Sequence, residues 1–556
     1  MPKPVTVTRR TTLAAISATA AVAAFPGLAE GKTEVFRHGV ASGDPDATSV
    51  VLWTRVTVPT PLEVDWELAS DPSFARVVRQ GRVTAGPERD FTIKVLAEGL
   101  EPGGRYFYRF RAAGAMSPIG QTRTLPVGRV ERLGIALASC SNFAFGYFNA
   151  YDAIARDAAI DFVLHTGDYI YEYGSDGWGG DISRRIGRVH EPANEIVSLF
   201  DYRTRHAQYK TDAGSQAMHA AKPLLACWDD HESANNPWTG GAQNHQPDKE
   251  GNWVDRRAAS IQAYFEWMPV REPGPGRTRM QFWRTWVFGD LATLSTLETR
   301  HTARARQIDY DPYRKTINSH AAARDMERDT FGAVGRTMLA RELEVDLIAA
   351  WTQSKLANQP WRLIGNPMPI ARTRVPDVVG LGLIPDPASQ AKPLSAAVDM
   401  AWKGKWNLPF YPDTWDGYEW ARERLYGQAR DAGVGDLVFL TGDSHSFWAN
   451  RLADAEGRPI GLELGTSGIT SPGDFVESGF DPVTAAKLDA AFAEHNPEVV
   501  WTDNLHQGYV RLILTREEGR ASFIAMSNIL SQRYTAHNIS DWRLVRSDGV
   551  LDLIRT

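Results

Sequence analysis

The sequence predicts an α/β protein preceded by a smaller all-β domain, and three observations lead to this fold class. The chain has 556 residues, more than one ordinary hydrophobic core holds, so two or more domains are expected. From about residue 36 to 126, short stretches alternate apolar and polar residues between turn residues, which is typical of a β-sandwich. From about residue 127 onward, apolar runs alternate with helical stretches, which indicates βα units.

Composition and charge exclude some function classes. The chain is 43% hydrophobic and 23% charged, as in globular proteins, and its formal net charge is −6. It therefore has no polycationic surface, and it contains no zinc-finger or helix-turn-helix pattern, so no stable nucleic-acid partner is expected. A mildly acidic protein can still cleave phosphate esters if metal ions supply the positive charge.

The first residues carry a targeting pattern. Arg9 and Arg10 precede an Ala-rich apolar run, Leu13–Ala24, and small residues follow up to Ala29. This arrangement predicts a twin-arginine signal over residues 1–29, which is read by the twin-arginine export machinery. The run is too short for a transmembrane helix, and no other segment approaches one. We therefore expect a soluble mature protein that is periplasmic or secreted.

The all-β domain is expected over residues 36–126. Its strands are separated by turn residues such as Pro102-Gly103-Gly104, and this late hairpin resembles that of fibronectin-III-like or Ig-like modules. Such a module binds or packs more often than it catalyses. The predicted strands are Thr48–Val56, Leu62–Leu68, Asp90–Val95 and Arg105–Arg111.

The α/β domain is expected over residues 127–545, followed by a C-terminal tail over 546–556. Its predicted helical stretches are Asn149–Asp157, Leu199–Ala221 and Arg336–Lys355. Its predicted strands are Leu133–Ala138, Phe162–His165, Leu224–Trp228, Gly289–Thr296, Trp361–Gly365, Leu437–Leu440, Gly461–Leu464, Gly508–Leu514 and Ala521–Ala525.

Four of these strands end in residues that bind metals. One ends at Cys140, the next leads into Asp168 and Tyr171, the third into Asp229-Asp230-His231, and the fourth into Asp443 and His445. Parallel strands of one sheet bring their carboxyl ends to the same edge, so we expect these side chains to lie close together. His165, inside a buried strand, is expected to be a core residue or to orient Asp168, whereas Tyr169 and Glu172 are expected to be ordinary loop residues.

The residue types indicate a site for two metals, which can clamp a phosphate ester during hydrolysis. Asp168 is placed to bridge the two. Cys140, Tyr171 and His445 would suit a ferric ion, because two strongly donating anions stabilise the oxidised metal. Asp230 and Asp443 would hold a second, harder cation such as Ca²⁺ or Mg²⁺.

The leaving alkoxide needs a proton donor, and His231 is the candidate because it is adjacent to Asp230. Cys140 is interpreted first as a metal thiolate; a disulfide with Cys227 and an inert core residue are the alternatives. Cys227 lies inside an apolar run and is interpreted as a small core residue.

Together these motifs resemble a known family. Gly167–Tyr171 (GDYIY), Trp228–Glu232 (WDDHE) and Gly442–His445 (GDSH) resemble the blocks of calcineurin-like metallophosphoesterases and purple acid phosphatases. With Ser139-Cys140 in place of the usual first block, the set resembles the PhoD-like alkaline phosphatase and phosphodiesterase family. The resemblance implies a metallophosphoesterase β-sandwich core flanked by helices, after the small all-β domain.

It also implies an exported alkaline phosphatase that hydrolyses monoesters and also diesters through a metal-bound hydroxide. Its cofactors would be Fe³⁺ and one or two Ca²⁺, with other divalent metals possible. Matched by position, iron would be held by Cys140, Asp168, Tyr171 and His445, and calcium by Asp168, Asp230 and Asp443.

The chain departs from the family at Glu298–His301, where Arg300 is kept as a candidate catalytic fork for the phosphate. Asn235, Arg188 and His506 are candidate contacts for a small phosphate ester substrate. For Arg188 a solvated surface position is the alternative. For His506 it is a position outside the site.

Two other functions stay open at this stage. One is phospholipase D-like cleavage of lipid headgroups, which uses the same hydrolytic residues and needs an apolar pocket mouth. The other is a non-catalytic protein that binds cell wall or carbohydrate through the β domain. The intact ligand set argues against the second.

Overall fold

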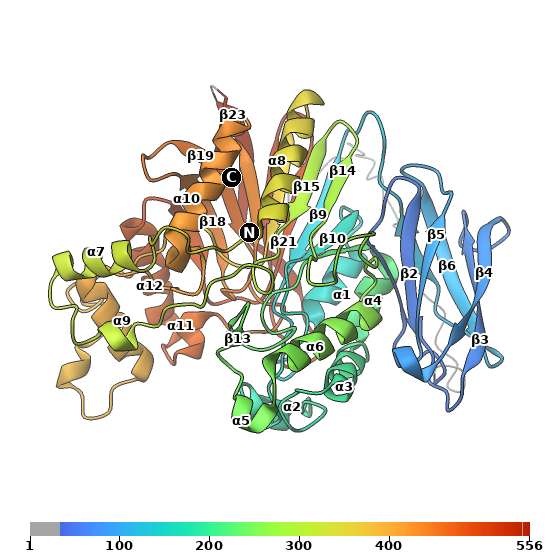
Figure 1. Cartoon of the computed structure of the whole chain (residues 1–556), viewed down its shortest axis with the longest axis horizontal. Helices are drawn as coiled ribbons and strands as arrows, with labels where there is room; N and C mark the ends of the chain where they lie inside the picture. Colours follow the sequence, from blue (N-terminus) through green and yellow to red (C-terminus); the bar gives the residue numbers. More distant parts are fainter. Residues whose placement is uncertain (1–33, 548) are drawn as a thin grey trace, which may run out of the picture.

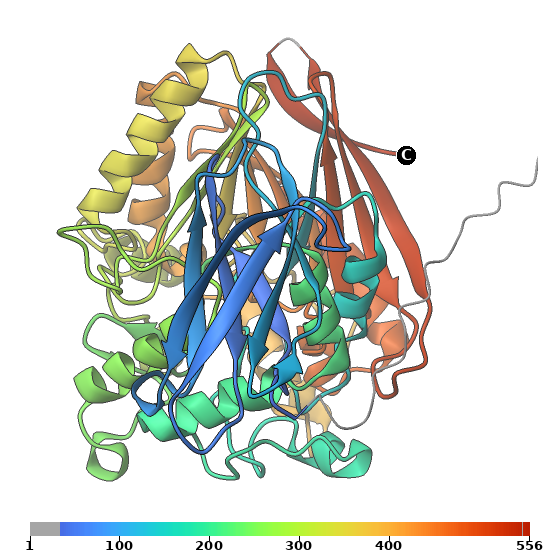
Figure 2. The same ribbon diagram turned by 90° about the vertical axis from the view of Figure 1, so that its right-hand side faces the viewer.

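The computed structural model describes residues 34–547 and 549–556, so the predicted signal over 1–29 lies outside the described residues. Two large sheets pack face to face in the centre of the molecule, and helices cover their outer faces (Figure 1). A smaller sheet of N-terminal strands lies at one end of the molecule, and this end faces the viewer in Figure 2.

The first large sheet has ten strands in the order β24-β23-β22-β21-β9-β10-β11-β1-β2-β5. In its middle β9, β10 and β11 run parallel, so their carboxyl ends share one edge. The bounds are β1 Val40–Gly43, β2 Ser49–Arg55, β5 Thr92–Glu98, β9 Leu133–Ala138, β10 Phe162–His165, β11 Leu224–Ala226, β21 Gly508–Leu514, β22 Gly519–Met526, β23 Ala536–Ser547 and β24 Val550–Arg555.

The second large sheet has seven strands in the order β14-β15-β16-β17-β19-β18-β20. Here β15, β16, β17 and β19 are parallel neighbours. The bounds are β14 Thr285–Phe288, β15 Ala292–Thr296, β16 Trp361–Asn366, β17 Leu437–Thr441, β18 Phe447–Ala453, β19 Pro459–Gly465 and β20 Val499–Asp503.

Buried apolar side chains lie in three layers. The central layer, between the two sheets, contains side chains of both, such as Phe162, Trp361 and Leu440. Helices α1 (Asn149–Arg156), α3 (Leu199–Tyr209), α4 (Ala213–Ala221) and α6 (Trp253–Trp267) cover the outer face of the first sheet. Helices α8 (Arg341–Leu356) and α10 (Glu419–Asp431) cover that of the second. The predicted α/β class, a β-sandwich core flanked by helices, is confirmed.

The N-terminal β-sandwich shares a sheet with this core. Its outer layer contains β3 (Leu62–Ala69), β4 (Val77–Ala85), β6 (Arg105–Ala112), β7 (Ala115–Met116) and β8 (Gly120–Arg123), and its inner layer is β1, β2 and β5. β1 pairs with β11 at Gly43 and Leu224. The pattern of each strand predicts the sandwich but does not show that its inner sheet continues into the core.

The predicted strands β9, β10 and β21 have the expected bounds. The tail expected over residues 546–556 is wrong, because β24 pairs antiparallel with the end of β23. Trp542 lies opposite Arg555 at one end of this pairing, and Ser547 lies opposite Val550 at the other. Leu551 and Leu553 are buried and join the central layer. Their alternation, apolar at every second residue, is the strand pattern that such a short segment carries only weakly.

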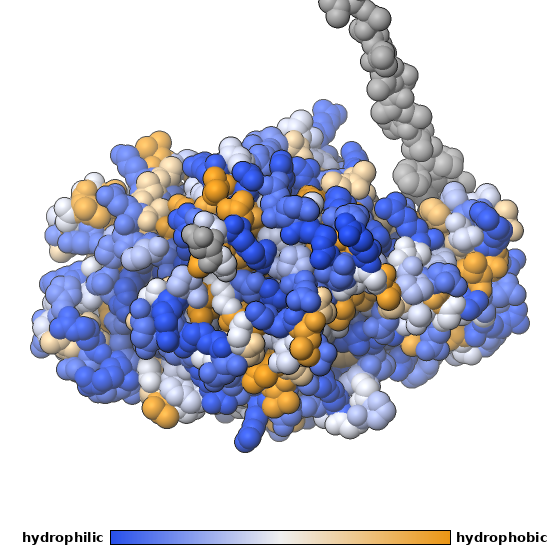
Figure 3. Space-filling view, turned by 90° about the horizontal axis from the view of Figure 1, so that it is seen from above, coloured by the Kyte–Doolittle hydropathy of each residue, from blue (hydrophilic) through white to orange (hydrophobic). Residues whose placement is uncertain are grey.

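The remaining helices lie around this frame, with α7 and α9 at the end opposite the N-terminal sandwich (Figure 1). Within the described residues, no helix is long and apolar enough to cross a membrane. The face seen from above is mainly hydrophilic, with small separated apolar groups (Figure 3). The bounds are α2 Gly180–Ile186, α5 Pro247–Glu250, α7 His320–Asp329, α9 Ser395–Trp406, α11 Asp474–Glu477 and α12 Pro482–His495.

Candidate active site

The predicted ligands come together at one edge of the two sheets. Cys140, Asp168 and Asp230 follow the parallel strands β9, β10 and β11, as expected. Asp443 and His445 follow β17, which belongs to the second sheet, so the expectation of a single sheet is wrong. The site lies where the carboxyl ends of parallel strands from two facing sheets meet.

The backbone is left-handed at several of these positions. The φ angle is 58° at Cys140, 55° at Asp168, 65° at Asp443 and 53° at His445. Non-glycine residues adopt this region at a cost, and such strain clusters at functional sites. Gly167 (φ 106°) is required as glycine, because a Cβ there would lie 2.3 Å from the amide nitrogen of Asp229.

The first cluster joins Cys140, Asp168 and His445, whose ligand atoms lie within 4.8 Å of one another. The Tyr171 hydroxyl belongs with them: it donates to Asp168 Oδ2 at 3.1 Å and lies 3.3 Å from His445 Nε2. Burial, and then the Asp168 charge, raise the pKa of the Cys140 thiol and of the Tyr171 phenol well above their ordinary values. A nearby cation is what would favour their anionic forms.

The second cluster joins Asp168, Asp229, Asp230 and Asp443, again within 4.8 Å. Asp168 is common to both clusters, as a bridging ligand must be. The fully buried Arg300 bonds to Asp229 through Nε, and its Nη2 lies 3.5 Å from Asp230 Oδ1 and 3.7 Å from Asp443 Oδ1. The sequence analysis named Asp229 at this strand end but assigned it to neither metal.

The donor set of both clusters fits metal ions. Burial, above all, raises the pKa of Asp168 and of Asp443, and repulsion by the neighbouring carboxylates raises it further. Asp229 Oδ2 and Asp230 Oδ1 are buried without a hydrogen-bond partner in the part of the chain that the structure describes. Buried carboxylates are normally paired or bound to cations, and an all-oxygen set suits a hard divalent ion.

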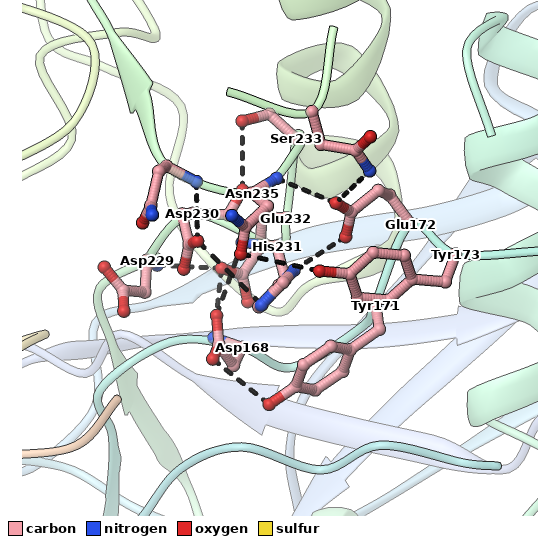
Figure 4. A network of polar contacts seen from close by, with 12 residues as sticks. Asp168, Tyr171, Glu172, Tyr173, Asp229, Asp230, His231, Glu232, Ser233 and Asn235 are labelled. Carbon is pink, nitrogen blue, oxygen red and sulfur yellow. Dashed lines mark hydrogen bonds and ion pairs between the residues drawn. The ribbon is translucent and has the colours of Figure 1, made fainter. Parts of the chain in front are cut away.

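His231 lies directly beside the second cluster (Figure 4). Its Nδ1 is 2.6 Å from Glu172 Oε2, and its Nε2 is 3.9 Å from Asp230 Oδ2. Burial lowers the pKa of His231, but the carboxylates of Asp230, Glu172 and Asp168 outweigh burial and raise it well above its ordinary value. The ring thus directs Nε2 toward Asp230, and the surrounding carboxylates favour its protonated form.

Glu172 is a buried partner of His231 that the sequence did not single out. It is fully buried and contacts His231. It also accepts hydrogen bonds from the backbone N–H of Asn235 and from Asn244 Nδ2, both at 2.8 Å. Burial raises its pKa, but the charge of His231 and these hydrogen bonds outweigh burial and lower it. Its place directly after Tyr171 was the available indication.

Two further carboxylates hold the ligand loops in place. Glu232 accepts the backbone N–H groups of Asp168 (3.1 Å) and Asp229 (2.7 Å), which ties the β10 and β11 loops together. Glu298 accepts the N–H of Arg300 at 2.9 Å and that of His301 at 2.7 Å. The departure of Glu298–His301 from the family pattern thus lies behind Arg300, where it fixes the backbone.

Of the three candidate substrate contacts, Asn235 lies beside the Glu172 and His231 pair. Arg188 is buried, pairs with Asp212 at 2.9 Å and stacks on Phe143 at 3.6 Å, so the alternative of a solvated surface position is wrong. The two Asp503 carboxylate oxygens each lie 3.0 Å from His506 Nδ1, and the structure gives no contact between His506 and the ligands. Arg188 and His506 are therefore not placed at the site by their contacts.

The residues interpreted as core also have clear places. His165 is buried, with Nε2 2.7 Å from the Tyr151 hydroxyl and Nδ1 3.3 Å from the Gly167 amide nitrogen. Cys227 is buried, and both it and Cys140 are free thiols. Tyr169, expected to be an ordinary loop residue, is buried, and its hydroxyl lies 2.8 Å from Lys210 Nζ and from His219 Nε2.

A two-sheet α/β core with clustered ligands, a buried guanidinium and a buried imidazole at its strand ends fits the class of phosphoric ester hydrolases. The family model for the PhoD-like phosphatase matches residues 135–523, and that for its N-terminal domain matches residues 20–126. The chain belongs to the PhoD-like phosphatase family.

Two relatives agree with this assignment. The chain is similar to alkaline phosphatase D of Bacillus subtilis (strain 168), with 33% identity over 519 residues, which cover 88% of this chain and 77% of that protein. It is also similar to a solved structure described as the structure of PhoD, with a TM-score of 0.74 and 30% identity, covering 94% of this chain and 92% of that one.

Proposed function

We propose that this chain is an exported, metal-dependent alkaline phosphatase that hydrolyses phosphate monoesters and also diesters. The observation that carries the proposal is the position of Asp168, which belongs to both ligand clusters. Arg300 stands beside one cluster and His231 beside both Asp230 and Glu172. Ligands, an anion-binding group and a proton donor thus surround one point.

The ligand roles follow from the chemistry of each cluster. Cys140, Tyr171 and His445 with Asp168 offer thiolate, phenolate, imidazole and carboxylate, which suit Fe³⁺. Asp230 and Asp443, again with Asp168, offer only oxygen and suit Ca²⁺, with Asp229 as their neighbour. Bound there, the ions would neutralise the phosphate oxygens and acidify the attacking water.

The protein residues supply orientation and the proton. Arg300 has Nη1 and Nη2 free of hydrogen bonds within the described chain, facing the ligand carboxylates, so a phosphate oxygen is a natural acceptor. His231 gives the Nε2 proton to the leaving oxygen, and Glu172 fixes the ring through Nδ1. Asn235 lines the same side of the site.

Export rests on the sequence alone. The paired residues Arg9 and Arg10, the apolar run and the small residues up to Ala29 support a periplasmic or secreted location. Because twin-arginine substrates cross the membrane folded, this route is compatible with a metal centre that is loaded before export.

The function is tested with two chromogenic esters, 4-nitrophenyl phosphate and bis(4-nitrophenyl) phosphate. We expect metal-replete protein to release nitrophenol from both, and a calcium chelator to abolish release because Asp230 and Asp443 would lose their cation. Added Ca²⁺ should restore the rate, and Mg²⁺ alone serves as the control. Absence of turnover on both esters by metal-replete protein would refute the proposal.

The iron assignment is tested by colour. Protein purified from an export-competent host should absorb visible light through charge transfer from the Tyr171 phenolate to Fe³⁺, and Tyr171→Phe should lose this band. Tyr173→Phe, which changes a half-buried phenol two residues away, is the matched control and should keep the band. A colourless wild-type enzyme of full activity would contradict the assignment.

A further inference from the structure

One indole covers both ligand clusters from the same side. The Trp178 ring lies 5.4 Å from the His445 ring and 6.5 Å from the His231 ring, and it is nearly parallel to each, at 18°. His445 belongs to the first cluster and His231 flanks the second. Trp178 is half-buried, so part of its surface remains open at the rim of the site.

The orientation of Trp178 is fixed from several directions. Its Nε1–H donates to Glu477 on α11. Its ring packs edge to face with that of Phe145, with 4.7 Å between the ring centres. The next residue, Gly179 (φ 88°), lies so close that a Cβ there would approach Phe145 Cε2 to 2.9 Å. The indole is therefore a formed wall of the site.

This wall stands on the side from which the leaving group departs, an argument that rests on the proposed function. If His231 Nε2 protonates the leaving oxygen, the organic group attached to that oxygen must lie on the His231 side. Tyr173 lies near His231 (Figure 4), with 5.4 Å between the two ring centres. The Tyr173 ring centre also lies 6.0 Å from that of Trp178. Arg300 contacts Asp229, Asp230 and Asp443 instead, and so marks the phosphate side.

We infer that Trp178 is a specificity-determining residue, which stacks on a planar aromatic leaving group, that is, an aryl ring bonded directly to the scissile oxygen. A flat aromatic surface gains most from another flat ring. An alkyl leaving group offers little planar surface and gains less. The substrate class that fits this site is therefore phosphate esters of phenols, whose aromatic ring is bonded directly to the scissile oxygen.

The test compares Trp178→Leu with Trp178→Phe on two monoesters, phenyl phosphate and 2,2,2-trifluoroethyl phosphate. The Leu variant keeps apolar volume without a planar ring, whereas the Phe variant keeps the ring. We expect Trp178→Leu to lower kcat/KM about five- to tenfold on the phenyl ester, mostly through KM, and less than about twofold on the trifluoroethyl ester. Trp178→Phe should retain most of the phenyl preference.

Comparing each variant with the wild type on the same ester cancels the difference in leaving-group acidity. If Trp178→Leu lowers kcat/KM by the same factor on both esters, the inference is overturned, because a purely structural role lowers both rates alike. A wild-type enzyme that hydrolyses neither ester refutes the proposed function instead. That outcome is distinct, since it appears before any Trp178 variant is made.

Discussion

His231→Ala should lower kcat/KM by about 10²–10⁴-fold on an alkyl phosphate and far less on 4-nitrophenyl phosphate. An alkoxide cannot leave without a proton, whereas nitrophenolate is stable enough to leave unprotonated. His231 is placed for this transfer by its 2.6 Å contact with Glu172 and by the carboxylates that raise its pKa. The measurement is kcat/KM across a series of leaving groups of graded acidity.

Glu172→Gln is the matched variant for this prediction. The amide keeps the shape and the hydrogen bonds to Asn235 and Asn244 in one rotamer, but it removes the negative charge that holds the proton on His231. We expect a smaller loss of the same kind, and a descending limb of the pH–rate profile shifted to lower pH, because the pKa of His231 falls. Equal losses on all leaving groups in His231→Ala would exclude a role in protonation.

The sequence predicts the site better than it predicts the surroundings of the site. Strand ends can be predicted because β9 and β10 are short, apolar runs followed by Ser139-Cys140 and by Thr166-Gly167-Asp168. Asp443 and His445 were also predicted, but for a wrong reason, since they come from the facing sheet. A strand pattern records which residues are buried on both faces and does not record which sheet a strand joins.

Supporting residues are harder to predict for a physical reason. Glu172 and Glu232 act through buried contacts to groups that lie 59 to 64 positions away in the chain, namely His231 and Asp168. A lone acidic residue in a loop has the same pattern whether it is solvated or buried. Arg188 is an example of a basic residue with the same difficulty. Its ion pair with Asp212, at the start of α4, cannot be predicted from the sequence because it depends on where α4 lies in the fold.

The cost of burying charge also explains why the metal ligands could be predicted from the sequence. Buried carboxylates are costly unless they are paired, so a run such as Asp229-Asp230 after an apolar strand requires a partner. Arg300 supplies part of the required charge, but Asp229 Oδ2 stays without a hydrogen-bond donor in the described chain. The sequence therefore indicates the need for cations, whereas the identity of each cation depends on the geometry of the donor atoms.

Asp168→Asn should lower kcat/KM by more than about 100-fold, whereas changing a residue that only hydrogen-bonds to a metal ligand typically costs about 10- to 100-fold. The reason is that Asp168 is the one residue common to both clusters, so its loss should remove both metals. Metal analysis of the purified protein measures this directly. Asp230→Asn should deplete calcium alone, and Tyr171→Phe should weaken iron alone, so these two variants are the controls for a shared ligand.

A folding defect is separated from a binding defect by thermal unfolding in the absence of metal. Asp168 is fully buried among Asp229, Asp230 and Asp443, and burial with these like charges raises its pKa. Removing its charge relieves repulsion, so the metal-free Tm of Asp168→Asn should equal or exceed that of the wild type, while the rise in Tm on adding metal should vanish. An Asp168→Asn protein that still binds both metals would disprove the bridge, because no other carboxylate joins the Cys140 and Asp443 clusters within the described residues.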